Sequence, residues 1–228
     1  MQDTKFTIQN SQFKMLNDLI TITPRHENAA RMVLDRILEL RAETPKEKMI
    51  ITVSGEVGTG KSTVSTALGL MLKKRDIRSK IMDLDDYYKI PPLERRKWRL
   101  ENGIDSIGYD EYDWDRVKKN ISDFKESKIS SMPCVDLITR YTDEITTNFE
   151  GVDMLIINGL YSLKIDNADL KVFIEMTYDE TKDAQKYSQK ENFDAYRLQI
   201  MQREHEVVQA LKSNAEYFVD FDNSMFHL

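Results

Sequence analysis

The stretch GEVGTGKS, from Gly55 to Ser62, follows the apolar run Met49–Val53 and precedes a segment with apolar residues at helical spacing. It has the form G-x-x-x-x-G-K-S, the P-loop signature, whose glycines let backbone N–H groups converge on phosphate oxygens. A strand, a loop and a helix in this order are the context that the signature requires. We therefore predict a phosphate-binding site rather than a plain glycine-rich turn, because such a turn has no use for the Lys-Ser pair.

The residues of this loop have distinct expected roles. Lys61 is predicted to reach the terminal phosphates of a nucleotide, and the Ser62 hydroxyl is predicted to hold Mg²⁺. The positive N-terminal end of the following helix would strengthen anion binding. The residues expected to bind the nucleotide are Gly55, Gly58, Thr59, Gly60, Lys61, Ser62 and Thr63.

The composition fits a single α/β domain with an addition. The chain has 228 residues, of which 40% are apolar and 32% charged, enough for a sizeable core and a charged surface. Its formal net charge of −6 argues against a general binder of nucleic acid or acidic membranes. No apolar run approaches the roughly 20 residues of a membrane span, and the beginning lacks the pattern of a signal peptide. We expect a cytoplasmic protein with no nucleic-acid or membrane partner.

Cysteine and histidine give no sign of a disulfide framework or a metal site. Cys134 is the single cysteine, which excludes an intramolecular disulfide. The three histidines, His26, His205 and His227, are scattered and lack metal-ligand spacing. Since His205 lies between two glutamates on a predicted helix, we expect it on a solvated face.

The order of elements predicts a three-layer α/β fold of the P-loop NTPase type, with a mostly parallel sheet. Near-continuous apolar runs are typical of parallel strands buried on both faces, and such runs alternate with helical segments along the chain. The strands expected after Met49–Val53 are Ser79–Asp85, Val152–Gly159, Leu170–Met176 and Ala215–Phe221. The helices expected after the P-loop helix are Leu93–Gly103, Asp113–Ser127 and most of Tyr178–Leu211.

An N-terminal extension, residues 1–45, is expected to precede a core domain of residues 46–228. Within it, Glu27–Arg41 has apolar residues at helical spacing, so this N-terminal helix must cover an apolar surface. The helix would either pack on the core alone or also form a contact between copies of the chain. A homo-oligomer is therefore a possible assembly.

A second polar stretch, DLDDYYK (Asp83–Lys89), ends the strand predicted after the P-loop helix. In an open α/β sheet this end faces the same crevice as the P-loop. The Asp85 carboxylate could there accept a hydroxyl proton as that oxygen attacks a terminal phosphate, and it could help to hold Mg²⁺. Tyr87 and Tyr88 could line a substrate pocket. The alternative is an acidic loop with ordinary tyrosines.

Together, the P-loop and this stretch resemble the uridine kinase and phosphoribulokinase group of P-loop kinases. Similar landmarks follow as DEYD (Asp110–Asp113), PCVD (Pro133–Asp136), LIINGLY (Leu155–Tyr161) and the pair Ala215–Glu216. The resemblance covers most of the chain, from about residue 49 to residue 220. It implies a kinase that transfers the γ-phosphoryl group of ATP, with Mg²⁺, to a hydroxyl of a small molecule.

The resemblance also implies roles for single residues. Asp85 would be the catalytic base, and Lys61 would act with it. The substrate-binding positions would be Tyr88, Asp85 and Arg140, and the metal-binding positions would be Ser62, Asp85 and Asn158. An arginine-rich lid would lie near residues 179–194.

Several positions depart from the family pattern. Gly108-Tyr109 stands where uridine kinases have His-Pro, and Val135 replaces a tyrosine, so the expected acceptor is not uridine. Asn158 replaces a carboxylate, and an amide is a poorer Mg²⁺ ligand. The lid region has lysines in place of arginines, and these offer point charges rather than bidentate contacts. They would contact phosphate or simply be solvated, and they are Lys182, Lys186 and Lys190.

Two alternatives stay open from the sequence. The basic run Arg95–Arg99 would lie on a plain surface helix or would contact a carboxylate or phosphate of the substrate. The chain would be a kinase, or a nucleotide-binding regulatory protein that has lost turnover. Asn158 and the lysine-only lid favour the regulatory protein, whereas Asp85 favours the kinase because a mere binder needs no base at the attack position.

Overall fold

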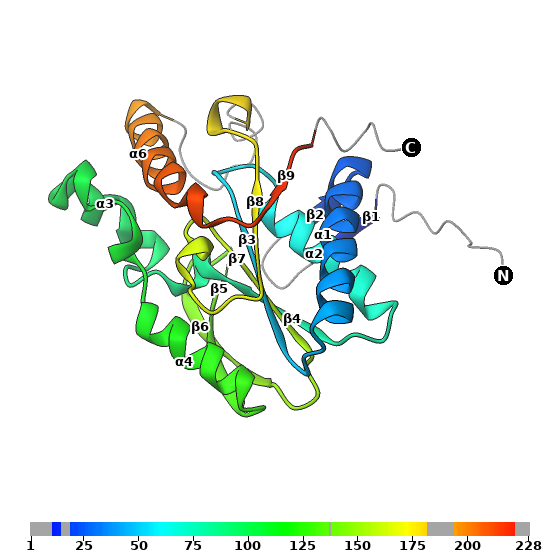
Figure 1. Ribbon diagram of the computed structural model, residues 1–228. Helices are drawn as coiled ribbons and strands as arrows, with labels where there is room; N and C mark the ends of the chain where they lie inside the picture. Colours follow the sequence, from blue (N-terminus) through cyan, green and yellow to red (C-terminus); the bar gives the residue numbers. More distant parts are fainter. Residues whose placement is uncertain (1–10, 15–18, 137, 182–193, 222–228) are drawn as a thin grey trace.

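The computed structural model describes residues 11–14, 19–136, 138–181 and 194–221 (Figure 1). Its centre is a five-stranded sheet in the order β4-β7-β3-β8-β9, in which every neighbouring pair is parallel. In that order the strands are Ser79–Asp83, Met154–Asn158, Met49–Ser54, Leu170–Ile174 and Tyr217–Val219. The predicted α/β fold with a mostly parallel sheet is confirmed.

Helices cover both faces of this sheet. On one face lie α1 and α2, and on the other lie α4 and α6, while α3 stands at the periphery (Figure 1). Successive residues of β3 serve the two faces, since Ile51 packs in the cluster of α2 and Ile50 in the cluster of α4. The helices are α1 (Pro24–Glu43), α2 (Lys61–Lys73), α3 (Pro92–Asn102), α4 (Trp114–Lys125) and α6 (Ala195–Leu211).

The N-terminal helix shares the core of the sheet domain. The α1 side chains of Ala30, Val33 and Ile37 are fully buried, in one cluster with Leu68 of α2. The helix begins at Pro24, three residues before the predicted start, because proline suits the first helical position, where a missing N–H costs nothing.

The register of the strands brings three polar ends together. Val53 of β3 pairs with Asn158 of β7, and Asn158 pairs in turn with Asp83 of β4. The P-loop follows β3 directly, so these strand ends lie at the same edge as the loop.

The second strand ends earlier than the sequence predicts. β4 stops at Asp83, and Leu84–Tyr87 forms a turn of 3-10 helix. The Asp83 carboxylate accepts the N–H of Asp85 at 3.0 Å, which satisfies the first donor of this turn. Asp85 therefore lies on a short helix just beyond the strand, rather than within it.

Two antiparallel hairpins were not predicted. They pair β1 (Ser11–Lys14) with β2 (Leu19–Ile22), and β5 (Ile129–Val135) with β6 (Thr142–Asn148). Most side chains of β6 are exposed, so its sequence lacks the apolar run by which a buried strand is recognised.

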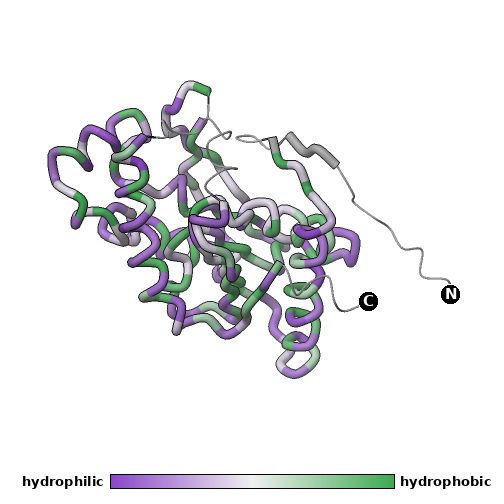
Figure 2. Tube along the Cα trace, turned by 90° about the horizontal axis from the view of Figure 1, so that it is seen from above, coloured by the Kyte–Doolittle hydropathy of each residue, from purple (hydrophilic) through white to green (hydrophobic). Residues whose placement is uncertain are grey.

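In Figure 2, hydrophobic stretches concentrate in the interior and hydrophilic ones are frequent along the outer helices. In the described part of the chain, no helix has the length and apolar character for crossing a membrane.

We predict that Ile37→Ala lowers the free energy of unfolding by about 2–5 kcal/mol, because it leaves a cavity in the cluster that α1 shares with α2. The exposed Asp35 on the same helix is the matched control, and Asp35→Ala should change stability by less than about 0.5 kcal/mol. Urea unfolding measures both. Equal effects of the two variants would show that α1 is not part of the cooperative core.

Candidate active site

The P-loop has a backbone that only glycine tolerates at key positions. Gly58 and Gly60 have φ of 78° and 82°, in the left-handed region. A Cβ on Gly60 would also lie 2.8 Å from Nε2 of His26, and one on Gly55 would lie 3.1 Å from the carbonyl oxygen of Ile174. The loop is thus a bare backbone cradle that ends at Lys61, the first residue of α2, as a phosphate-binding loop requires.

The Lys61 ammonium lies against the loop and near carboxylates. Its Nζ donates to the carbonyl oxygen of Glu56 at 2.7 Å. Burial lowers the pKa of Lys61, and among the carboxylates that oppose this shift Asp85 acts most strongly, followed by Asp83. The predicted base is therefore the carboxylate that acts most strongly on the predicted phosphate-binding lysine.

Ser62 and Asn158 meet at the sheet edge. The Ser62 hydroxyl donates to Asn158 Oδ1 at 3.4 Å, and Asn158 is 2% exposed. A hydroxyl and an amide oxygen are hard oxygen donors of the kind that Mg²⁺ accepts, usually together with waters and phosphate oxygens. Within the described residues no group of three or more His, Cys, Asp or Glu side chains has the arrangement of a metal site. These residues fit a Mg²⁺ that is held mainly by a nucleotide.

Asp85 and Asp86 differ in environment although they are neighbours. Asp85 is exposed at the sheet edge. The Asp86 carboxylate instead accepts the N–H of Val135, the last residue of β5, at 2.8 Å. Burial raises the pKa of Asp86 to about 6. Asp86 thus anchors the β5–β6 hairpin, whereas Asp85 is exposed just beyond the end of β4.

Two stretches that the sequence singled out lie side by side. Tyr88 of DLDDYYK and Tyr112 of DEYD form a β-bridge, and their ring centroids are 4.1 Å apart. The Arg95 guanidinium lies over the Tyr88 ring, 3.4 Å from its centroid. Tyr87 does not line a pocket, because it is buried and its hydroxyl donates to Asn120 at 2.9 Å.

The basic helix α3 is not a plain surface helix. Arg99 is 3% exposed and donates to both carboxylate oxygens of Glu111, at 2.6 and 2.9 Å. It also pairs with Glu204 of α6 at 3.4 Å. Arg99 therefore neutralises two buried carboxylates and is committed to the fold rather than to a substrate.

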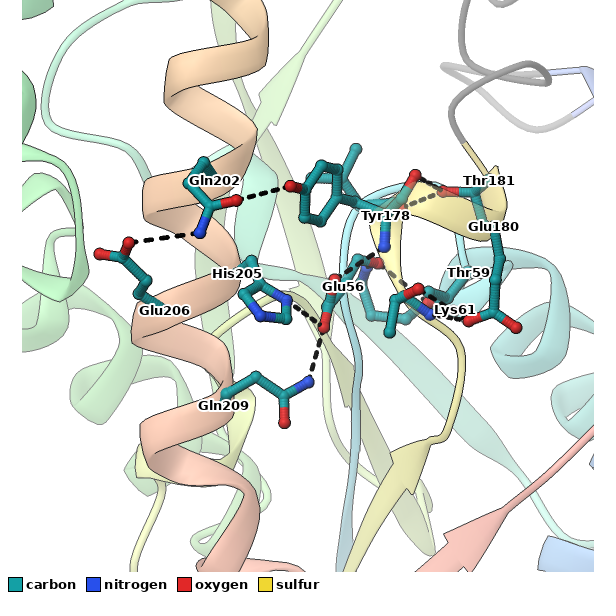
Figure 3. A network of polar contacts seen from close by, with 12 residues as sticks. Glu56, Thr59, Lys61, Tyr178, Glu180, Thr181, Gln202, His205, Glu206 and Gln209 are labelled. Atoms are coloured by element: carbon teal, nitrogen blue, oxygen red, sulfur yellow. Dashed lines mark hydrogen bonds and ion pairs between the residues drawn. The ribbon is translucent and has the colours of Figure 1, made fainter.

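The expectation for His205 was wrong. Its Nδ1 lies 2.7 Å from the Glu56 carboxylate, and Glu56 is 1% exposed within the P-loop (Figure 3). The sequence could not indicate this contact, because Glu56 occupies a variable position of the signature and 149 positions separate the two residues. A histidine between two glutamates on a helix resembles a solvated face unless its partner is known.

The remaining predicted site positions are Arg140 and the lysines of the lid. Arg140 lies in the turn after β5, where its N–H donates to the carbonyl oxygen of Asp136 at 2.7 Å. The three lysines of the predicted lid, Lys182, Lys186 and Lys190, lie outside the described residues. Thr181, the last described residue before that region, donates its hydroxyl proton to the carbonyl oxygen of Val57 at 2.9 Å.

Comparison with known proteins agrees with this geometry. The family model described as "Phosphoribulokinase / Uridine kinase family" matches residues 50–188. A uridine kinase of Ureaplasma parvum is 29% identical over 143 residues, which span 59% of this chain and 66% of the length of that relative.

Two solved structures share the fold. A D-glycerate 3-kinase from Cryptococcus neoformans has a TM-score of 0.57 at 13% identity, over 86% of this chain and 96% of that one. The phosphoribulokinase from Rhodobacter spheroides has a TM-score of 0.55 at 13% identity, over 79% and 74% of the two chains.

We predict that Asp86→Asn stabilises the protein more at pH 8 than at pH 4. The pKa of Asp86 is raised from 3.8 to about 6 on folding, so the folded state holds the proton more tightly and stability is lost as the pH rises through this window. Asparagine keeps the acceptor for Val135 but does not ionise. The stability gain of the variant should grow by about 2 kcal/mol between the two pH values.

Urea unfolding of both proteins at pH 4 and pH 8 measures this difference. The same gain at both pH values would mean that Asp86 is not held in a desolvating environment.

Proposed function

Because the chain belongs to the phosphoribulokinase/uridine kinase family, we propose that it is an ATP-dependent kinase that phosphorylates a hydroxyl group of a small metabolite. The observation that carries this proposal is a P-loop lysine under the electrostatic influence of a carboxylate that follows the end of β4, at the same edge of the sheet. Among carboxylates, Asp85 has the largest effect on the pKa of Lys61. A protein that only binds nucleotide has no need of a base there.

The proposed reaction is an in-line phosphoryl transfer. The acceptor oxygen forms a bond to the γ-phosphorus, and the bond between that phosphorus and the β–γ bridging oxygen breaks, leaving its electron pair on ADP. The hydroxyl proton passes to the Asp85 carboxylate, which is exposed at the crevice and can accept it.

The other residues would bind and orient the reactants. The backbone of Gly55–Gly60 and the N–H groups at the start of α2, including those of Ser62 and Thr63, would hold the phosphates, and Lys61 would offset their charge. Mg²⁺, bound with ATP, would reduce the charge repulsion between phosphate oxygens. Ser62, Asp85 and Asn158 would hold it, although the Asn158 amide supplies a dipole and no charge.

The acceptor side of the site would lie beside Tyr88. This side chain contacts both Tyr112 and Arg95, and the turn that carries Arg140 follows the strand anchored by Asp86. Of the positions that distinguish this chain from uridine kinases, Tyr109 begins the short helical turn just before Tyr112, and Val135 is the last residue of β5. These differences support an acceptor other than uridine.

A regulatory nucleotide-binding protein without turnover is the second candidate, and Asn158 is the observation that favours it. The amide faces Ser62 at the edge where the family carries a carboxylate. Such a protein would bind Mg-ATP as the kinase does but would transfer no phosphoryl group. Binding and turnover must therefore be measured separately.

We predict that Mg-ATP binds and stabilises the fold. A ligand at 100 times its dissociation constant adds about 2.7 kcal/mol to the free energy of unfolding, which corresponds to a rise in melting temperature of about 5–10 °C for a chain of this size. Lys61→Ala should abolish most of the rise. An unchanged melting curve of the parent protein at millimolar Mg-ATP would exclude both candidate functions.

We predict that Asp85→Asn leaves Mg-ATP binding intact but lowers turnover by about 10²–10⁴-fold, the usual cost of losing a general base. Turnover is measured as ADP release with an acceptor found by screening hydroxyl-bearing metabolites, including nucleosides and sugar acids. Asp86→Asn is the matched control, because that carboxylate is tied to Val135, and it should retain the parent rate.

If Asp86→Asn instead lost turnover while Asp85→Asn retained it, the base would be Asp86. A parent protein that binds Mg-ATP and phosphorylates no acceptor in the screen would favour the regulatory candidate.

A further inference from the structure

The Glu56 carboxylate ties the P-loop to two other segments of the chain. A buried charge is costly unless it is hydrogen-bonded, and this one has a donor for each oxygen. Oε2 accepts the N–H of Tyr178 at 2.7 Å. Oε1 accepts from Gln209 Nε2 at 2.6 Å and lies 2.7 Å from His205 Nδ1 (Figure 3). Because a carboxylate only accepts, His205 Nδ1 is the donor in this contact.

The main chain of Glu56 contacts the lysine of the loop. Its carbonyl oxygen accepts from Lys61 Nζ at 2.7 Å and from the Thr59 hydroxyl at 2.9 Å (Figure 3). One residue therefore connects α6, through its side chain, with the phosphate-binding ammonium, through its carbonyl group. A displacement of the side chain would move the peptide that orients Lys61.

Helix α6 also contacts Arg99 of α3. Glu204, the residue before His205, pairs with Arg99, and Arg99 makes a two-pronged contact with Glu111. Tyr178 adds to the junction, because its hydroxyl donates to Gln202 of α6 at 2.6 Å and its ring meets the edge of the His205 ring. The helix is thus held by contacts on both sides, and His205 reaches the loop from it.

We propose that His205 and Glu56 are positioning residues for ATP binding. The hydrogen bond from His205 Nδ1 holds Glu56, and the Glu56 carbonyl group holds Lys61 where the terminal phosphates of ATP require it. The inference rests on the proposed function, since it assigns a role toward the nucleotide of that reaction. It adds a P-loop position outside the glycine, lysine and serine of the signature, together with a partner from a distant helix.

The test compares His205→Asn with His205→Gln. The amide nitrogen of asparagine is as many bonds from Cα as Nδ1 of histidine, so it can donate to Glu56 from the same place. The amide nitrogen of glutamine is one bond farther away and cannot do so without displacing the loop. Both variants keep an uncharged polar side chain, so any difference between them reports the position of the donor.

Isothermal titration with Mg-ATP gives the dissociation constants. His205→Asn should bind within about twofold of the parent, and His205→Gln should bind about tenfold more weakly, or about 1.4 kcal/mol. Glu206→Ala is the matched control, because Glu206 is the next residue on the helix and half-exposed, and it should bind as the parent does. Ligand-free melting curves confirm that each variant is folded.

The results separate this inference from the proposed function. Equal affinities of the Asn and Gln variants, whether both strong or both weak, would overturn the positioning role while leaving the kinase proposal intact. Failure of the parent protein to bind Mg-ATP would overturn the proposed function, and the positioning role with it.

Discussion

The common edge at which parallel strands end is the constraint on which the candidate site depends. Parallel strands run in one direction, so their C-terminal residues gather at one edge of the sheet. In this chain the edge receives the P-loop after β3, Asn158 at the end of β7, and Asp83 with the following turn at the end of β4. Ser62 and Asn158 meet there although 96 positions separate them in the chain.

Charge at this edge is balanced by contacts from outside the sheet. The Lys61 ammonium lies among carboxylates, and Glu56 places a further buried carboxylate inside a loop suited to anions. That carboxylate is accommodated because His205, Gln209 and the Tyr178 N–H all donate to it. A second buried group, Arg99 with Glu111 and Glu204, ties α3 to α6. Helix α6 therefore contacts both the P-loop and Arg99 of α3.

The departures from the family pattern lie in side chains near the proposed site and leave the P-loop backbone unchanged. The glycines and Lys61 of the P-loop keep the backbone geometry of an anion cradle. If the edge holds Mg²⁺ as proposed, the uncharged Asn158 would leave more of the binding to Ser62, Asp85 and the nucleotide itself. In the proposed site, Val135 and Tyr109 would alter the acceptor side. An altered acceptor on a conventional nucleotide loop is consistent with all of these changes.

The sequence by itself determined the features that depend on short stretches of chain. The strand, loop and helix around Gly55–Ser62 were predicted because spacing and periodicity are local properties, and the parallel sheet followed from the alternation of apolar runs with helices. The turn at Asp85 was misplaced by two residues because a side-chain cap from Asp83 competes with strand extension. Only the tertiary structure decided that Asp86 anchors a hairpin, that Arg99 is buried, and that His205 supports the P-loop. Each of these depends on a partner far away in the chain, and no local pattern records which distant carboxylate or N–H group a side chain will meet.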